Sequence, residues 1–90
     1  MSAEVIDYVP QAGQITMFST EWCGYCKRLK KMLDSEGIVY TEIDIEHTPG
    51  TPELVEAVNG GNRTVPTVIY PDATTATNPS LIDVKSKLGV

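Results

Sequence analysis

Cys23 and Cys26 are the only cysteines of the 90-residue chain, and two residues separate them in the stretch WCGYC (22–26). Side chains three positions apart on a helix are about 5–6 Å apart at Cβ, and Cα separations across a disulfide are about 4.4–6.8 Å. The spacing therefore permits a disulfide that forms and breaks. A structural disulfide, half of a metal site and a redox-active pair are the three alternatives.

Two of these alternatives are weak in this chain. A structural disulfide that closes so short a loop stabilises little. A zinc site needs four ligands, whereas the chain offers two thiols and one distant imidazole, His47, which we expect in an exposed loop. We therefore expect no metal ligands, and a redox pair is favoured.

The elements around the cysteines give them different roles. The β-prone run 14–20 leads into the motif, and the apolar positions Cys26, Leu29, Met32 and Leu33 predict one face of a helix over 24–36. Cys23 then lies at the helix N-terminus, where the thiol pKa falls from about 8.5 to about 3.5–7.5. The pattern predicts that Cys23 attacks and that Cys26, deeper on the apolar face, resolves. A cation cluster at residues 27–31, made of Lys27, Arg28, Lys30 and Lys31, is a secondary contribution or a solvated helix face.

The remaining elements predict an α/β fold of order β-α-β-α-β-β-α. Strands are expected at 38–46, 64–70 and 74–77, and the first two strands form a parallel pair because a helix connects them. Thr51 is expected to cap a second helix that ends at Asn59, and Asn78 a last helix that reaches Leu88. A mixed four-stranded sheet flanked by helices follows. Residues 13–90 are expected to form this domain, with 1–12 an N-terminal extension that is an edge strand or a loose tail.

Composition excludes several functions. Twelve acidic residues against seven cations give a formal charge of −5, which argues against nucleic acid as a partner. No apolar run approaches the length of a membrane span, and the first 20 residues lack the features of a secretory signal. We therefore expect a cytoplasmic protein with no membrane partner, and we expect a monomer.

A second motif, RTVPTV (63–68), supplies a docking site for a thiol substrate. Proline at the start of a strand cannot donate to the sheet. If the Val65–Pro66 bond is cis, the backbone N–H and C=O of Val65 turn outward. An extended thiol substrate then pairs with them like an added strand.

The two motifs together resemble the glutaredoxin branch of the thioredoxin superfamily over nearly the whole chain. The resemblance implies a thioredoxin/glutaredoxin fold, a cis bond before Pro66, and a site that includes Thr64 and Val65. The chain departs from glutaredoxins where they hold the charged ends of glutathione. Thr20 stands in place of a common lysine, TNPS (77–80) in place of Gly-Gly-X-Asp, and Gly24 in place of the active-site proline.

The stretches WCGYC, VNGGNRTVPTV and TNPS closely resemble mycoredoxins, which use mycothiol, a sugar–inositol thiol without a carboxylate. The resemblance implies reduction of mixed disulfides between proteins and mycothiol, with Cys23 as nucleophile. Trp22, Tyr25, Arg63 and Asn78 complete the implied thiol-binding residues. No bound cofactor is implied; mycothiol is the reducing co-substrate, and NADPH supplies electrons through a mycothiol disulfide reductase.

Two rival functions stay open on the sequence. One is a dithiol protein-disulfide reductase that receives electrons directly from a flavoprotein reductase. The other is a dimer that holds a [2Fe–2S] cluster, as some glutaredoxins do that have glycine in place of the active-site proline. Identifying the reductant that supports turnover, mycothiol or the flavoprotein, distinguishes the first rival function. A colourless protein after anaerobic purification counts against the second.

Overall fold

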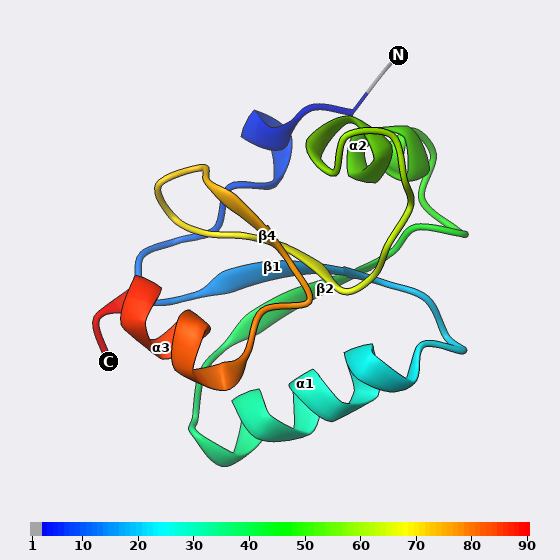
Figure 1. Ribbon diagram of the computed structural model, residues 1–90. Helices are drawn as coiled ribbons and strands as arrows, with labels where there is room; N and C mark the ends of the chain where they lie inside the picture. Colours follow the sequence, from blue (N-terminus) through cyan, green and yellow to red (C-terminus); the bar gives the residue numbers. More distant parts are fainter. Residues whose placement is uncertain (1–2) are drawn as a thin grey trace.

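The computed structural model describes residues 3–90 and has the predicted order of elements (Figure 1). A 3₁₀ helix, Val5–Tyr8, comes before strand β1 (Ile15–Ser19), helix α1 (Gly24–Ser35), strand β2 (Tyr40–Asp44), helix α2 (Thr51–Val58), strands β3 (Thr67–Ile69) and β4 (Thr75–Thr77), and helix α3 (Leu81–Leu88). The predicted α/β class is therefore confirmed. Within residues 3–90, none of the helices is long and apolar enough to span a bilayer.

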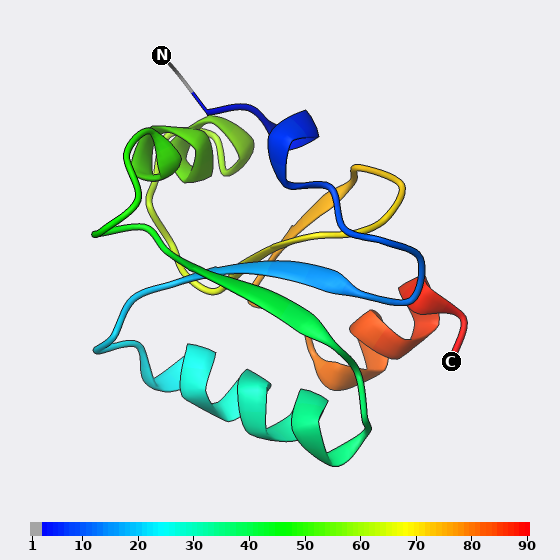
Figure 2. The same cartoon turned by 180° about the vertical axis from the view of Figure 1, so that it is seen from behind.

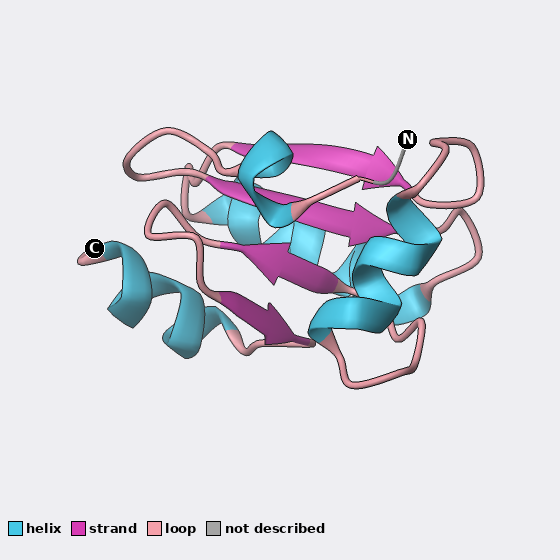
Figure 3. Ribbon diagram, turned by 90° about the horizontal axis from the view of Figure 1, so that it is seen from above, coloured by secondary structure: helices cyan, strands magenta, loops and turns pink. Residues whose placement is uncertain are grey.

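The four strands form one mixed sheet in the order β2-β1-β3-β4 (Figure 3). β1 and β2 are parallel and place Ser19 opposite Asp44 at their carboxyl ends. β3 runs antiparallel to β1, and β4 antiparallel to β3. The predicted parallel pair is confirmed, and the strands expected at 64–70 and 74–77 pair with each other as a hairpin. β3 is shorter than the predicted strand 64–70, because the chain leaves the ladder at Pro66, which has no N–H to donate.

Helices cover both faces of the sheet. α1 and α3 lie on one face, and α2 lies on the other together with the 3₁₀ helix (Figures 1 and 2). β1 is sandwiched between these layers, so all five of its residues are buried. Burial on both faces explains why ITMF reads as an almost continuous apolar run. The chain therefore reaches Cys23 directly from a central strand that is buried and paired on both sides.

The described part of the N-terminal segment forms neither an edge strand nor a loose tail, the two alternatives that the sequence leaves open. In the described part of residues 1–12, which begins at Ala3, the 3₁₀ helix packs on the sheet. The Tyr8 ring meets Phe18 edge-on at 5.4 Å between centroids, and Thr16 Oγ1 donates to the Tyr8 carbonyl at 2.6 Å. These contacts bind the segment to β1.

Both predicted helix caps are wrong by one or two residues. Gly50, with φ 82°, is the N-cap of α2, because the buried Thr51 donates its hydroxyl to the Thr48 carbonyl at 2.6 Å instead of capping. Ser80, not Asn78, caps α3. Its Oγ accepts from the Asp83 N–H at 3.0 Å, and the Asp83 carboxylate accepts from the Ser80 N–H at 3.2 Å. Asn78 is instead a turn residue with φ 46°.

The Ser80 cap predicts a measurable loss of stability on substitution. We expect Ser80→Ala to lower the free energy of unfolding by about 1 kcal/mol, because one orphan N–H of α3 loses its acceptor. Urea unfolding followed by circular dichroism measures the change. Ser86→Ala, an exposed serine within the same helix, is the matched control and should leave stability unchanged or slightly raised. Equal effects of the two substitutions would contradict the cap.

The pair between Lys30 on α1 and Glu42 on β2 predicts a pH-dependent contribution. Lys30 Nζ lies 2.9 Å from Glu42 Oε2, and Ser19 Oγ donates to the same oxygen at 2.7 Å. Partial burial raises the pKa of Glu42, but these hydrogen bonds outweigh it and lower the pKa below the ordinary 4.5. Stability from this carboxylate is present above its unfolded pKa and is lost as the pH falls through its folded pKa. We expect Glu42→Gln to cost about 0.5 kcal/mol near pH 7 and the difference to vanish in acid, measured by urea unfolding at both pH values.

Candidate active site

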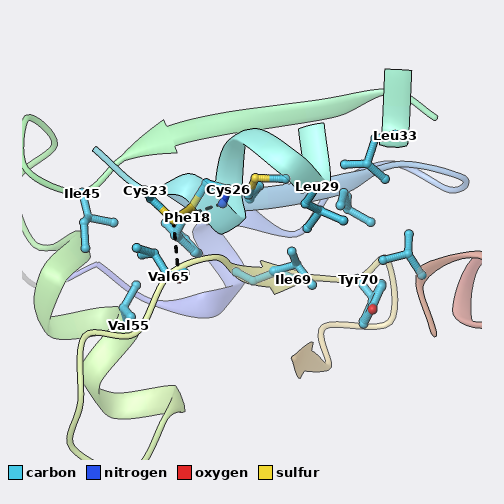
Figure 4. Packing of buried hydrophobic residues seen from close by; sticks show 14 of the residues in the cluster. Phe18, Cys23, Cys26, Leu29, Leu33, Ile45, Val55, Val65, Ile69 and Tyr70 are labelled. Carbon is cyan, nitrogen blue, oxygen red and sulfur yellow. Dashed lines mark hydrogen bonds between the residues drawn. A yellow bond between two sulfur atoms is a disulfide. The ribbon is translucent and has the colours of Figure 1, made fainter. Parts of the chain in front are cut away.

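Cys23 is the N-cap residue of α1. It has extended backbone angles of φ −79° and ψ 107°, and its Sγ accepts a hydrogen bond from the Cys26 backbone N–H at 3.1 Å. The two cysteines form a disulfide with a Cα separation of 5.3 Å (Figure 4). The predicted position of the pair, at the junction of β1 and α1, is therefore confirmed.

The environment of Cys23 favours a thiolate once the disulfide is reduced. The helix N-terminus presents unpaired N–H groups and the positive end of the dipole, and the Cys26 N–H already points at Cys23 Sγ. Both cysteines are buried in the core cluster, Cys23 at 4% and Cys26 at 1% exposure. Burial disfavours the charged form of either thiol, so the backbone N–H at the helix N-terminus, which is directed at Cys23 Sγ, is what distinguishes them. This difference matches the predicted roles of attacking and resolving thiols.

The Val65–Pro66 bond is cis, as the resemblance implied, and it lies beside the cysteines. Cys23 Sγ is 3.6 Å from the Val65 carbonyl oxygen (Figure 4). The oxidised sulfur has no proton, so only the reduced thiol donates to this oxygen. Within residues 3–90 the Val65 N–H makes no hydrogen bond. That N–H is therefore unpaired in a segment that lies next to the reacting sulfur.

Asn59 and Asn78 hold the loop that carries Val65. Asn59 Nδ2 donates to Thr67 Oγ1 at 2.9 Å and to the Thr64 carbonyl at 3.3 Å. The Asn78 backbone N–H donates to the Pro66 carbonyl at 2.7 Å. Sequence reasoning read Asn59 only as a helix stop. The only sequence signal for these hydrogen bonds to the loop is an amide side chain a few residues before Pro66.

Trp22 precedes Cys23, and Tyr25 lies between the two cysteines. Both side chains are largely exposed, at 70% and 64%. Trp22 Nε1 donates to Glu46 Oε1 at 3.1 Å, which fixes the indole over the turn that follows β2. In that turn His47 Nδ1 lies 2.8 Å from Asp44 Oδ2. This contact raises the pKa of His47 and lowers the pKa of Asp44. His47 is exposed, as predicted.

Other predicted site residues contact segments outside the cysteine motif. Arg63 pairs with Glu56 of α2, and that hydrogen bond raises its pKa. Thr64 is exposed and contributes its carbonyl to the Asn59 contact. Of the cation cluster, Lys30 is engaged by Glu42, whereas Lys27, Arg28 and Lys31 are exposed.

A groove of about 370 Å³ extends from the active-site loop between α1 and α3. Apolar side chains of both helices and polar groups of the β4–α3 turn form its walls. The lining residues are Tyr25, Arg28, Leu29, Met32, Asn78, Pro79, Ser80, Leu81 and Ile82. Tyr25 joins the groove to the cysteine motif, and Asn78 joins it to the Pro66 loop.

Known proteins share both the sequence and the architecture. Mycoredoxin 1 of Corynebacterium glutamicum is 46% identical over 74 residues, which are 82% of this chain and 91% of the relative. The Mycobacterium tuberculosis protein Rv3198A, which is named as a glutaredoxin, is 55% identical over 74 residues, 82% of this chain and 88% of the relative. The crystal structure of the Archaeoglobus fulgidus glutaredoxin superposes with a TM-score of 0.68 at 23% identity, covering 84% of this chain and 86% of that one.

The glutaredoxin family model matches residues 15–72. That range includes β1, both cysteines and the cis Val65–Pro66 bond, so the match covers the reacting sulfurs and the segment beside them. Structure and comparisons thus agree on a thioredoxin-like fold with a cysteine pair for thiol–disulfide exchange. The chain belongs to the glutaredoxin family, and it is a thiol–disulfide oxidoreductase.

Proposed function

We propose that the chain reduces mixed disulfides between proteins and mycothiol in the cytoplasm, acting as a monomer through one thiol. The observation that carries this proposal is the placement of Cys23 Sγ, which lies at the N-terminus of α1 and beside the Val65 backbone. The identity to a protein named mycoredoxin supports mycothiol as the thiol.

Exchange chemistry gives the steps. The Cys23 thiolate attacks the mycothiol sulfur of the mixed disulfide, and the substrate protein leaves as a thiolate that takes up a proton. Cys23 is then disulfide-bonded to mycothiol. The thiolate of a second mycothiol attacks the mycothiol sulfur of that bond, which releases mycothiol disulfide and regenerates the Cys23 thiolate. Two electrons from NADPH, passed through mycothiol disulfide reductase, return mycothiol disulfide to two thiols.

The groove supports a neutral, hydroxyl-rich ligand. Its lining includes an aromatic ring, Tyr25, and the side-chain donors of Arg28 and Asn78, and it includes no carboxylate. Glutathione carries an ammonium group that the acid of Gly-Gly-X-Asp usually holds, and here Ser80 stands in that place. Mycothiol has no such group, so its sugar and inositol hydroxyls require only hydrogen-bond partners.

One observation favours a second candidate, the dithiol protein-disulfide reductase. Cys23 and Cys26 are joined by a disulfide, which is the oxidised form that such an enzyme passes through. In the dithiol route Cys26 attacks Cys23 of the mixed disulfide, and a flavoprotein reductase then reduces the internal disulfide. In the monothiol route the same disulfide is a side state.

Turnover with defined reductants tests the proposal. A mycothiolated protein substrate is incubated with the enzyme, mycothiol, mycothiol disulfide reductase and NADPH, and NADPH oxidation is followed. Parallel reactions contain glutathione with glutathione reductase, or a thioredoxin-reductase-like flavoenzyme. We expect sustained turnover only with mycothiol. Turnover that needs the flavoenzyme and proceeds without mycothiol would overturn the proposal in favour of the dithiol route.

A further inference from the structure

Three metal-ligating side chains gather beside the active-site loop, where β1 and β2 end. Parallel neighbouring strands bring their carboxyl ends together, and the register places Ser19 opposite Asp44. Glu21 follows β1 by two residues, and His47 lies in the turn after Asp44. One ligand atom from each of Glu21, Asp44 and His47 lies within 4.8 Å of the others. The topology of the sheet therefore assembles two carboxylates and an imidazole from separate segments.

The geometry of this cluster suits a common metal ion. Ligand atoms about 2.0–2.2 Å from Zn²⁺ are about 3.3–3.6 Å apart at the tetrahedral angles that the ion adopts. His47 Nδ1 and Asp44 Oδ2, which are 2.8 Å apart and hydrogen-bonded without a metal, would separate slightly to hold the ion between them. Asp44 is also held in place, since its Oδ1 accepts from the Glu46 N–H at 2.9 Å. The ligand atom of Glu21 lies within 4.8 Å of the other two, so binding of an ion would require the side chains to close around it.

A buried hydroxyl next to the cluster provides an independent observation. Thr20 is 5% exposed, and its Oγ1 has no hydrogen-bond partner among residues 3–90. Buried polar side-chain atoms in folded proteins nearly always have one. Thr20 lines a polar cavity of about 270 Å³ together with Glu21 and Asp44. A hydrated ion held by those two carboxylates would bring a water molecule, or the ion itself, to this oxygen.

The charges around the cavity favour a cation. Lys30 is the positive group in the lining, and Glu42 neutralises it at 2.9 Å. The carboxylates of Glu21 and Asp44 then leave a surplus of negative charge in the lining. Imidazole nitrogen together with carboxylate oxygen suits Zn²⁺ and similar ions, whereas Mg²⁺ prefers oxygen ligands alone.

We propose that Glu21, Asp44 and His47 bind one divalent ion of the Zn²⁺ type, with Thr20 and water completing its surroundings. The ion would link two segments near the cysteines. One is the loop after β1 that carries Trp22, and the other is the turn after β2 that carries Glu46. This site is separate from the cysteine pair and does not depend on which thiol the enzyme uses.

The chain has one histidine and one tryptophan, and both lie at this place, so they report on binding directly. The protein is used without an affinity tag and in its disulfide form, so that no thiolate ligates the metal. Zn²⁺ is titrated while the imidazole resonances of His47 are followed by NMR and the stoichiometry by calorimetry. We expect one ion per chain with a shift of the His47 resonances. Mg²⁺ at the same concentrations should leave them in place, and Co²⁺ should quench Trp22 fluorescence.

Substitutions of single ligands complete the test. Asp44→Asn and Glu21→Gln should each weaken Zn²⁺ binding by about tenfold or more, at least the loss that follows removal of a partner in a metal site. Asp72→Asn, which removes an exposed acid in the β3–β4 turn, is the matched control and should bind as the unmodified chain does. Circular dichroism verifies that each variant is folded. The proposal is overturned by unshifted His47 resonances up to about 1 mM Zn²⁺. Equal affinity in Asp44→Asn, or binding that occurs only after reduction of the cysteines, would overturn it as well.

Discussion

Cys23→Ser is expected to abolish turnover of a mycothiolated substrate, whereas Cys26→Ser is expected to keep much of it. Only Cys23 Sγ lies at the helix N-terminus with a backbone N–H directed at it and the Val65 backbone beside it. A serine hydroxyl at this position is far less acidic than a thiol and forms no disulfide. In the monothiol route the second cysteine is dispensable, because mycothiol itself resolves the mixed disulfide.

Steady-state NADPH oxidation with each variant measures this difference. Mass spectrometry supplies a second readout, because Cys26→Ser incubated with mycothiol disulfide should accumulate one mycothiol on Cys23. Thermal unfolding of the reduced proteins serves as the control for folding. If Cys26→Ser is as inactive as Cys23→Ser on the mycothiolated substrate, the monothiol mechanism is wrong and the dithiol route is favoured.

Local sequence signals were sufficient for the elements and for the cysteine pair. The apolar positions Cys26, Leu29 and Leu33 are one helical turn apart, and all three are buried on the face of α1 that meets the sheet. Gly37, which directly follows the predicted helix 24–36, has φ 68°, and the Ile38 N–H donates to the Leu33 carbonyl at 3.0 Å. Such signals act over a few residues, so the chain itself displays them.

The features that the sequence did not reveal depend on contacts between distant segments. A proline after Thr51 or Asn78 resembles a cap followed by the first helical residue, but burial of Thr51 and the turn at Asn78 override that signal. Glu21 and His47 are 26 positions apart, and only the parallel pairing of β1 with β2 brings them together. The cis Val65–Pro66 bond has no local signature either, and it was expected only because of the family resemblance.

The pKa of Cys23 should lie well below the free-thiol value of about 8.5, within the range of about 3.5–7.5 found for cysteines at helix N-termini. Two contacts act in opposite directions. The Cys26 N–H donates to Sγ at 3.1 Å and stabilises the thiolate, whereas the Val65 carbonyl, 3.6 Å away, accepts a hydrogen bond only from the neutral thiol. Burial of Cys23, which is 4% exposed, also disfavours the charged form. The N–H contact is the shorter of the two and is reinforced by the helix dipole, so we expect the thiolate to be favoured overall.

Thiolate absorbance of Cys26→Ser as a function of pH measures this pKa, because only Cys23 then titrates and the backbone N–H of residue 26 is retained. Neutral substitutions at Lys27, Arg28 and Lys31, which are exposed, should raise the pKa modestly, and salt should screen their effect. Lys30→Gln should change it least, since Glu42 already neutralises Lys30. Lys87→Gln on α3, which breaks the pair of Lys87 with Asp72, is the control. A Cys23 pKa near the free value would contradict both the nucleophile assignment and the argument from the helix N-terminus, because each requires a thiolate near neutral pH.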